Sequence, residues 1–349
     1  MTEADSPRAR PDVRQLPDLA GRVLGGTVVY TNDDAFADVH NLLSPGPATH
    51  DPTAFGHRGK IYDGWETRRR RTPGADVAII RLAAPAVVHG VNIDTSFFKG
   101  NYPPAASVHA TTMLGYPSAE ELLQAPWVPL IEHAPLQGDS ENVIPVSGGP
   151  RLVTHVRLTI HPDGGVARFR VHGEVVPDPR ILGGRVDLAA TVHGARLAAC
   201  SNMFYSSPAN VLSPGRATVM SDGWETSRRR DDGNDWLVVR LAAPGLLHHA
   251  IIDTTRFLGN APGWARLSDA ESGAELLPLT RLQPDTEHWF PIASDAVVSL
   301  VRLDIHPDGG ISRLRLHGAV APTHHDAVVR RWTSLLGPDI SVDPTEFFS

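Results

Sequence analysis

Asp-Gly-Trp-Glu-Thr-Arg-Arg-Arg-Arg occupies Asp63–Arg71, and it returns as Asp222–Arg230 with eight of its nine residues identical. We call these two segments the arginine motifs. Each places an acid, a large aromatic ring and several guanidinium groups within one short stretch. A match of this length does not arise by chance, so we infer that the chain is an internal duplication.

Other landmarks return with the arginine motifs. Asp94 returns as Asp253 after 159 residues, the same spacing as the motifs, whereas His161 returns as His306 after 145 residues. The first copy therefore carries 14 extra residues, and they fall around Ser118–Leu123. A Ser-x-x-Glu capping pattern predicts one short helix there. Length changes that fall in loops while strand-like segments stay in register are typical of a duplicated domain.

The domain boundaries follow from these spacings. We expect a flexible N-terminal tail over residues 1–21, a first repeat over 22–178, a second repeat over 179–322 and a helical C-terminal tail over 323–349.

Short apolar stretches and frequent Gly/Pro turns predict an all-β fold. Val77–Leu82 and Val87–Asp94 are expected to form two antiparallel strands joined by a turn at Ala83-Ala84-Pro85. Val153–Ile160 and Val166–His172 are expected to form a hairpin. The predicted fold is a tandem pair of jelly-roll β-sandwiches.

Composition narrows the classes of function. The chain has 349 residues, a net charge of -7 and one cysteine, Cys200. An acidic balance argues against a nucleic-acid partner, because such proteins usually carry a basic surface. We see no signal peptide and no apolar run long enough for a membrane span, so we expect a cytoplasmic protein without a membrane partner. Exposed sheet edges commonly associate, and we expect a homo-oligomer.

The arginine motifs are the first candidates for binding. Trp65 and Trp224 are interpreted as core anchors beneath an Asp-Gly turn. If the following residues are extended, Glu66 and Arg70 lie on one face and Arg69 on the other. Guanidinium groups grip a carboxylate through two parallel hydrogen bonds, whereas an isolated arginine run is usually just solvated. We favour a binding role for Arg69 and Arg70 and for their counterparts, Arg228 and Arg229.

The segment His161-Pro162-Asp163 and its copy His306-Pro307-Asp308 lie at predicted hairpin tips. A histidine beside a carboxylate suggests general acid–base chemistry. Simple turn capping by the aspartates is an equally open alternative.

Asp94 and Asn101, repeated as Asp253 and Asn260, lie in a loop that follows a strand. Small polar side chains on a loop held by a rigid sheet commonly form binding sites. Turn bonding by Asp and Asn is the structural alternative.

Motifs for metal binding or nucleophilic catalysis are lacking. The sequence has no His-Glu-x-x-His, no cysteine pair and no Gly-x-Ser-x-Gly elbow, and Cys200 is interpreted as inert packing. We predict no metal ligands and no resident cofactor, and leave a divalent-metal requirement open. Any chemistry would then be direct attack by activated water.

From about Leu16 to Pro322 the chain resembles the allantoicase family. The segments that carry the resemblance are Leu16–Ala20, Asp63–Arg70, Gly100–Val108 and His161–Gly165, together with their second-half counterparts. The second copy departs from the family pattern at Ala261, where the first has Tyr102. The resemblance implies two galactose-binding-like jelly rolls, in agreement with the fold expected from the residues.

The resemblance also implies hydrolysis of a small-molecule substrate, allantoate, to (S)-ureidoglycolate and urea, a step of purine breakdown through allantoin. Two alternatives stay open: a non-catalytic module that binds carbohydrate or another small ligand, and a hydrolase of another ureide. For catalysis we select Glu66, His161, Asp163, Glu225, His306 and Asp308. For substrate binding we select Arg69, Arg70, Asp94, Asn101, Arg228, Arg229, Asp253 and Asn260.

Overall fold

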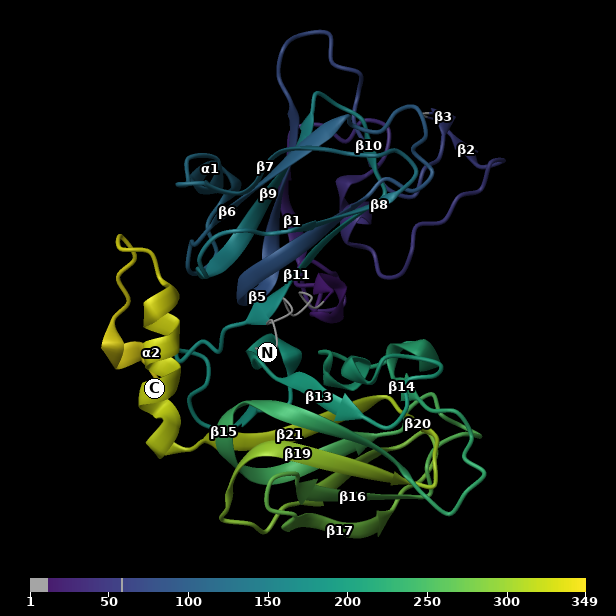
Figure 1. The fold of residues 1–349 in the computed structure, drawn as a ribbon, viewed down its shortest axis with the longest axis vertical. Coiled ribbons are helices and arrows are strands. Elements are labelled where there is room, and N and C mark those ends of the chain that lie inside the picture. The colour runs from purple at the N-terminus through teal and green to yellow at the C-terminus, as the bar shows by residue number, and fades with distance from the viewer. Residues whose placement is uncertain (1–11, 58) are drawn as a thin grey trace, which may run out of the picture. The chain divides into compact units, whose positions relative to one another are not determined.

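The computed structural model describes residues 12–57 and 59–349, and the chain divides into two compact units, Met1–Glu174 and Val175–Ser349. Each unit is an antiparallel β-sandwich (Figure 1). Residues 1–11 of the expected N-terminal tail lie outside the described residues. Leu19 and Ala20, also placed in that tail, are instead fully buried. Among the described residues, the helices are too short or too polar to traverse a bilayer.

Unit 1 is organised around one long strand, β5. The sheet runs in the order β1-β5-β9-β6-β7, β8 and β11 also pair with β5, and β4 pairs with β10. The elements are η1 (Val13–Gln15), β1 (Thr27–Thr31), η2 (Val39–Leu43), β2 (Phe55–Gly56), β3 (Gly59–Lys60), β4 (Trp65–Glu66), β5 (Asp76–Asp94), β6 (Ala105–Thr111), α1 (Ala119–Leu123), β7 (Val128–Pro135), β8 (Glu141–Pro145), β9 (Val153–His161), β10 (Gly165–Val166) and β11 (Arg168–Val175).

Unit 2 repeats this plan around β15, in the order β12-β21-β15-β19-β16-β17, with β13 and β18 also on β15 and β14 paired with β20. The elements are β12 (Val186–Asp187), η3 (Thr191–His193), β13 (Arg196–Cys200), η4 (Pro208–Leu212), η5 (Met220–Asp222), β14 (Trp224–Glu225), β15 (Asp235–Asp253), β16 (Trp264–Asp269), β17 (Glu275–Arg281), β18 (Glu287–Pro291), β19 (Val297–His306), β20 (Gly310–Ile311), β21 (Arg313–Val320), η6 (Pro322–His324), α2 (His325–Leu335) and η7 (Pro344–Glu346).

The turn expected at Ala83-Ala84-Pro85 is wrong, because β5 runs through it as one strand of 19 residues. Ala84 and Ala86 are buried while Ala83 and Pro85 are half-buried, so the period-2 alternation continues across the supposed turn. Pro85 has no N–H to offer a partner strand, and it lies where the pairing with β9 shifts register, between Arg81 and Ala86.

The hairpin expected from Val153–Ile160 and Val166–His172 is also wrong. The strands β9 and β11 both pair with β5 rather than with each other. The pairing in unit 2 shows this arrangement. Strand β19 pairs with Asp235–Arg240 of β15, β21 pairs with Leu247–Asp253, and both pair with Gly245 and Leu246 between these ranges. One long strand therefore pairs with two sets of neighbours. The residues between β9 and β11, 162–167, which we call the return segment, include β10, and β10 pairs with β4.

Two local predictions are confirmed. The short helix α1 begins at an N-cap, Ser118, whose hydroxyl accepts from the Glu121 N–H while the Glu121 carboxylate accepts from Ser118 N–H, a complete capping box. The helix expected near the C-terminus is α2, drawn in yellow in Figure 1. Its apolar residues Val328, Trp332 and Leu335 are buried.

The motif tryptophans are core anchors, as expected. Trp65 and Trp224 are both 0% exposed. Each indole N–H donates to a backbone carbonyl, Trp65 to Asp33 at 2.7 Å and Trp224 to Asn202 at 2.8 Å. A buried indole with a satisfied N–H fixes the start of each arginine motif against its own sandwich.

His155 on β9 predicts an acid sensitivity of unit 1. Its side chain is buried, and burial, helped by the positive charge of Arg81, lowers its pKa from 6.5 to about 4. The unfolded chain therefore takes up a proton between these values while the folded chain does not, so stability falls as the pH drops from 6.5 towards 4. We expect a loss of about 1–3 kcal/mol in the free energy of unfolding over this window.

Urea denaturation of the wild type and of His155→Gln at pH 7 and pH 4.5 would measure this loss. The variant should show the smaller difference between the two pH values. Equal differences in both proteins would contradict a role for His155.

Candidate functional site

The two predicted site segments lie side by side in each unit. Strand β4 pairs with β10, so Glu66 faces Gly165 and Trp65 faces Val166. The pairing continues past the strand, because Thr67 N–H donates to the Gly164 carbonyl at 3.2 Å. In unit 2, β14 and β20 make the matching pair. The arginine motif and the His-Pro-Asp-Gly-Gly segment therefore form one structure.

The paired glycines behind each aspartate allow a close approach of the next loop. Gly164 has a φ of +139°, and a Cβ added at Gly165 would lie 2.0 Å from the ring of Phe98. No residue with a side chain fits there. The Gly165 N–H donates to the Asn101 carbonyl at 2.8 Å, which fixes the loop that carries Asn101.

Glu66 and Asn101 form the central polar contact of this structure. The Asn101 amide donates to the Glu66 carboxylate at 2.6 Å, and in unit 2 Asn260 donates to Glu225 at the same distance. Burial raises the pKa of Glu66, and the hydrogen bond from Asn101 opposes that rise. A half-buried carboxylate with an elevated pKa, held in one orientation, suits general acid–base work.

Arg70 is fixed at both its backbone and its guanidinium group. The Asp163 carboxylate accepts from Arg70 N–H at 2.7 Å, and the Arg70 Nη1 pairs with Asp76 Oδ1 at 2.5 Å. Unit 2 repeats both contacts, Asp308 to Arg229 N–H at 2.8 Å and Arg229 Nη1 to Asp235 at 3.0 Å. The aspartates Asp163 and Asp308 therefore orient the arginine motifs.

The extended alternation expected along the motif ends at Thr67, since Arg68 and Arg69 are both exposed. Arg68 pairs with Asp33 at 2.6 Å. In unit 2 this ion pair is replaced by a neutral hydrogen bond, from the amide of Asn202 to the hydroxyl of Ser227 at 2.7 Å.

The side chains of Arg69 and Arg228 have no hydrogen-bond or ion-pair partner among the described residues. Both side chains are exposed, and within residues 12–57 and 59–349 neither forms an ion pair. A guanidinium group in this state keeps all its donors available for an anionic ligand.

The imidazoles of His161 and His306 do not contact the carboxylates that follow them in sequence. His161 Nε2 lies 2.8 Å from Ser107 Oγ, and its ring lies 4.8 Å from that of His133. Burial, followed by the charge of His133, lowers the pKa of His161. Burial also lowers the pKa of His306, whose charged neighbours are Asp304 and Arg266. Each histidine and its aspartate therefore act on different neighbours.

Asp94 and Asp253 close the turns that follow the long strands. Asp94 accepts from Ser96 N–H at 2.8 Å, and Asp253 accepts from Thr255 N–H at 2.8 Å. Both side chains are buried. The Asp94 carbonyl also accepts from Ala167 N–H at 2.7 Å, which ties the end of β5 to the return segment.

Two further residues of the site, Asp76 and Asp235, were missed in the sequence. They are 1% and 0% exposed, and each is the first residue of its long strand. Asp76 accepts from Asn32 as well as from Arg70, and Asp235 accepts from Ser201 as well as from Arg229. The signal was available, since each lies 13 residues after the first residue of its arginine motif.

No group of three or more His, Cys, Asp or Glu side chains within the described part of the chain is arranged to hold a metal ion. The carboxylates of the site are instead occupied by arginine, asparagine and backbone N–H donors.

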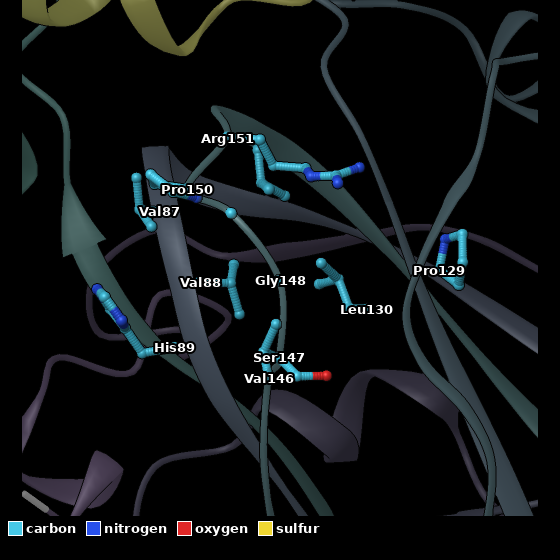
Figure 2. Close-up of a pocket in the computed structure, with 12 residues that line it drawn as sticks. Val87, Val88, His89, Pro129, Leu130, Val146, Ser147, Gly148, Pro150 and Arg151 are labelled. Carbon is cyan, nitrogen blue, oxygen red and sulfur yellow. The ribbon is translucent and has the colours of Figure 1, made fainter. Parts of the chain in front are cut away.

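A pocket of about 270 Å³ lies elsewhere in unit 1 (Figure 2). It is lined by β5, β7 and the segment that leads into β9, with Val88 and Leu130 among the residues drawn. None of its twelve described lining residues is Asp or Glu, and none belongs to the predicted site. This pocket therefore offers no carboxylate, and its ionisable side chains are His89 and Arg151.

Comparison with known proteins gives one consistent result. The sequence matches the family described as the allantoicase repeat over residues 17–176 and 186–321. A protein of Nocardia farcinica named "Probable allantoicase" is 53% identical over 91% of this chain and 99% of its own. A "Probable allantoicase" of Streptomyces coelicolor is 48% identical over 88% and 86% of the two chains.

The crystal structure of allantoicase from Saccharomyces cerevisiae superposes with a TM-score of 0.75 at 35% identity, covering 86% of this chain and 92% of the yeast chain. The fold, the duplicated motifs and these similarities agree: the chain belongs to the allantoicase family.

Proposed function

We propose that the protein is a hydrolase that converts allantoate and water to (S)-ureidoglycolate and urea. The observation that carries this proposal, beside the family, is the Glu66–Asn101 contact, whose carboxylate belongs to the same motif as Arg69 and Arg70. Allantoate is a small carboxylate whose α-carbon bears two ureido groups. The reaction breaks the bond from that carbon to one ureido nitrogen and leaves the oxygen of water on the carbon.

The arginine motif supplies the recognition step. Arg69 is exposed and unpaired among the described residues, and Arg70 is fixed at its backbone by Asp163. Two guanidinium groups at adjacent positions suit a carboxylate, which accepts parallel hydrogen bonds in one plane. We assign the substrate carboxylate to this pair and Asp163 to its positioning.

Glu66 supplies the proton transfer. An ionised Glu66 takes a proton from the attacking water, and the same group then returns a proton to the departing urea nitrogen. Its raised pKa brings its proton affinity closer to neutral pH, where both steps are effective. Asn101 keeps the carboxylate in one orientation. His161 stays in the proposal as a second proton carrier, with Ser107 as its hydrogen-bonding partner.

Incubation of the purified protein with allantoate, with urea as the measured product, tests this function. Urea release that depends on enzyme concentration is the expected result. No urea above the blank, with and without added divalent metal, would overturn it.

We expect Arg69→Ala and Arg70→Ala to raise KM for allantoate, because each removes a guanidinium group from the site that holds the substrate carboxylate. A loss of about 1.5–3 kcal/mol per charge-assisted contact is typical. Arg71→Ala removes a neighbouring exposed arginine and is the matched control. Wild-type kinetics in both Arg69→Ala and Arg70→Ala, with native circular dichroism, would remove the arginines from the site.

A homo-oligomer and a cytoplasmic location belong to the same proposal. The outermost strands β7 and β17 end their sheets and leave an edge for association. Cys200 is a free thiol, which suits a reducing compartment.

A further inference from the structure

The two arginine motifs differ at the equivalent residues Arg70 and Arg229. The difference is whether the Nε/Nη2 edge of the guanidinium group already binds a carboxylate of the protein. In unit 2, Arg229 Nε and Nη2 each donate to the Asp231 carboxylate at 2.9 Å. Its Nη1 donates to Asp235 at 3.0 Å. All three guanidinium nitrogens therefore have a carboxylate partner within the unit, and the Nε/Nη2 edge is held bidentately.

In unit 1 the same edge lacks its carboxylate. Arg70 Nη1 donates to Asp76 at 2.5 Å, as in the other unit, but Arg70 Nε is buried and has no hydrogen-bond partner. The position that corresponds to Asp231, 159 residues earlier, is Thr72, a neutral and exposed residue.

The two guanidinium groups otherwise occupy equivalent places. The side chains of Arg70 and Arg229 are 24% and 25% exposed. A Cβ added at Gly74 would lie 2.5 Å from Arg70 Nη2, and one added at Gly233 would lie 2.6 Å from Arg229 Nη2. The difference between the units is therefore the acceptor and not the placement of the arginine.

A buried donor without an acceptor costs free energy, and most such donors in proteins are satisfied. A ligand carboxylate at the Nε/Nη2 edge of Arg70 would reproduce the contact that Asp231 makes in unit 2. We propose that, within the Arg69–Arg70 pair, the Nε/Nη2 edge of Arg70 makes the bidentate contact with the allantoate carboxylate, and that Asp231 blocks the equivalent edge of Arg229. The inference rests on the proposed function and assigns substrate binding to unit 1.

Asp231 is expected to outcompete a free ligand for the Nε/Nη2 edge of Arg229. A group tethered by a short segment acts at an effective concentration on the order of millimolar. Enzymes commonly have KM values of about 1 μM–1 mM, so substrate at such levels competes poorly with a resident carboxylate. Asp231 is also held in place, because it accepts from Gly233 N–H at 3.0 Å. These contacts lower the pKa of Asp231, so it stays ionised at neutral pH.

Moving the carboxylate into unit 1 tests the inference. Thr72→Asp places an acid where unit 2 has Asp231, and Thr72→Asn is the neutral control of nearly equal size. We expect Thr72→Asp to raise KM for allantoate at least about tenfold, since a charge-assisted bidentate contact is displaced. We expect Thr72→Asn to stay within about twofold of wild type, because surface substitutions are usually near neutral.

The matched change in unit 2 completes the test. Asp231→Asn removes the resident charge, and kcat/KM is expected to stay within about twofold of wild type, as for other exposed substitutions. Equal KM values for Thr72→Asp and Thr72→Asn would overturn the inference. So would a loss of activity in Asp231→Asn as large as that in Thr72→Asp.

Calorimetric titration with allantoate separates this inference from the proposed function. If the wild type binds allantoate without releasing urea, the proposed function fails, and weaker binding by Thr72→Asp alone still supports the inference. If the wild type neither binds nor hydrolyses allantoate, both fail.

Discussion

Replacing Glu66 by glutamine is expected to lower kcat for allantoate about 10²–10⁴-fold, the usual contribution of a positioned acid–base group. Glutamine keeps the size of the side chain and can still accept the hydrogen bond that Asn101 donates at 2.6 Å. It cannot take a proton from water. The loss should therefore appear in kcat, measured by urea release, with the fold unchanged by circular dichroism.

The pH dependence of activity is a second test of Glu66→Gln. Burial raises the pKa of Glu66 above 4.5, and a base must be ionised to act. Activity should therefore rise with pH through that raised value, and this acidic limb should be missing from Glu66→Gln. Glu225→Gln is the matched change in unit 2, where Asn260 makes the same contact. An equal loss in both variants would show that the two units share the reaction.

Trp65→Ala is expected to destabilise unit 1 by about 3–5 kcal/mol, the usual cost of removing a large buried aromatic. Trp65 is fully buried, and its indole N–H donates to the Asp33 carbonyl. The substitution leaves a cavity at the start of the arginine motif, and the Asp33 carbonyl loses one of its two donors and keeps the Thr31 hydroxyl. Urea denaturation should show the loss as a lower midpoint for the transition of this unit.

Two further variants control for the site of the change. Trp65→Phe keeps most of the ring volume and should lose less stability than alanine. Trp289→Ala removes an indole that is 61% exposed, and it should stay within about 0.5 kcal/mol of the wild type. A similar midpoint for Trp65→Ala and Trp289→Ala would contradict the anchoring role.

Local and periodic features were predictable from the sequence. The duplication, the buried tryptophans and the α1 capping box each depend on residues close together in the chain or on a comparison of the two copies. The sandwich class followed from strand-like patterning and turns. Family resemblance and residue chemistry pointed to the same reaction.

Features that depend on distant partners were not predictable. Ala83-Ala84-Pro85 has the composition of a turn, and only the pairing of β5 with different neighbours along its length keeps it extended. Asp76 looks like an ordinary acid at a strand start until Arg70 and Asn32 are brought to it. The separation of His161 from Asp163 likewise follows from Ser107 and Arg70, which lie far away in sequence.

Both ends of each long strand are tied to the same short segment. Asp76 N–H donates to the Pro162 carbonyl and the Asp94 carbonyl accepts from Ala167 N–H, so the return segment joins the beginning of β5 to its end. A straight strand of 19 residues would span roughly 60 Å at about 3.3 Å per residue, so β5 must bend back on itself.

Unit 2 closes β15 in the same way, with Pro307 at one end and Ser312 at the other. Hydrogen bonds from the arginine motifs to the aspartates Asp163 and Asp308 stabilise these closed arrangements, as the bond from Arg229 N–H to Asp308 does in unit 2. A duplicated copy can therefore give up its reaction and still need nearly the same residues to complete its architecture. Sequence similarity between the two halves then reflects what each unit needs in order to fold. Whether a unit is catalytically competent has to be judged from which of its hydrogen-bond donors lack a partner in the protein.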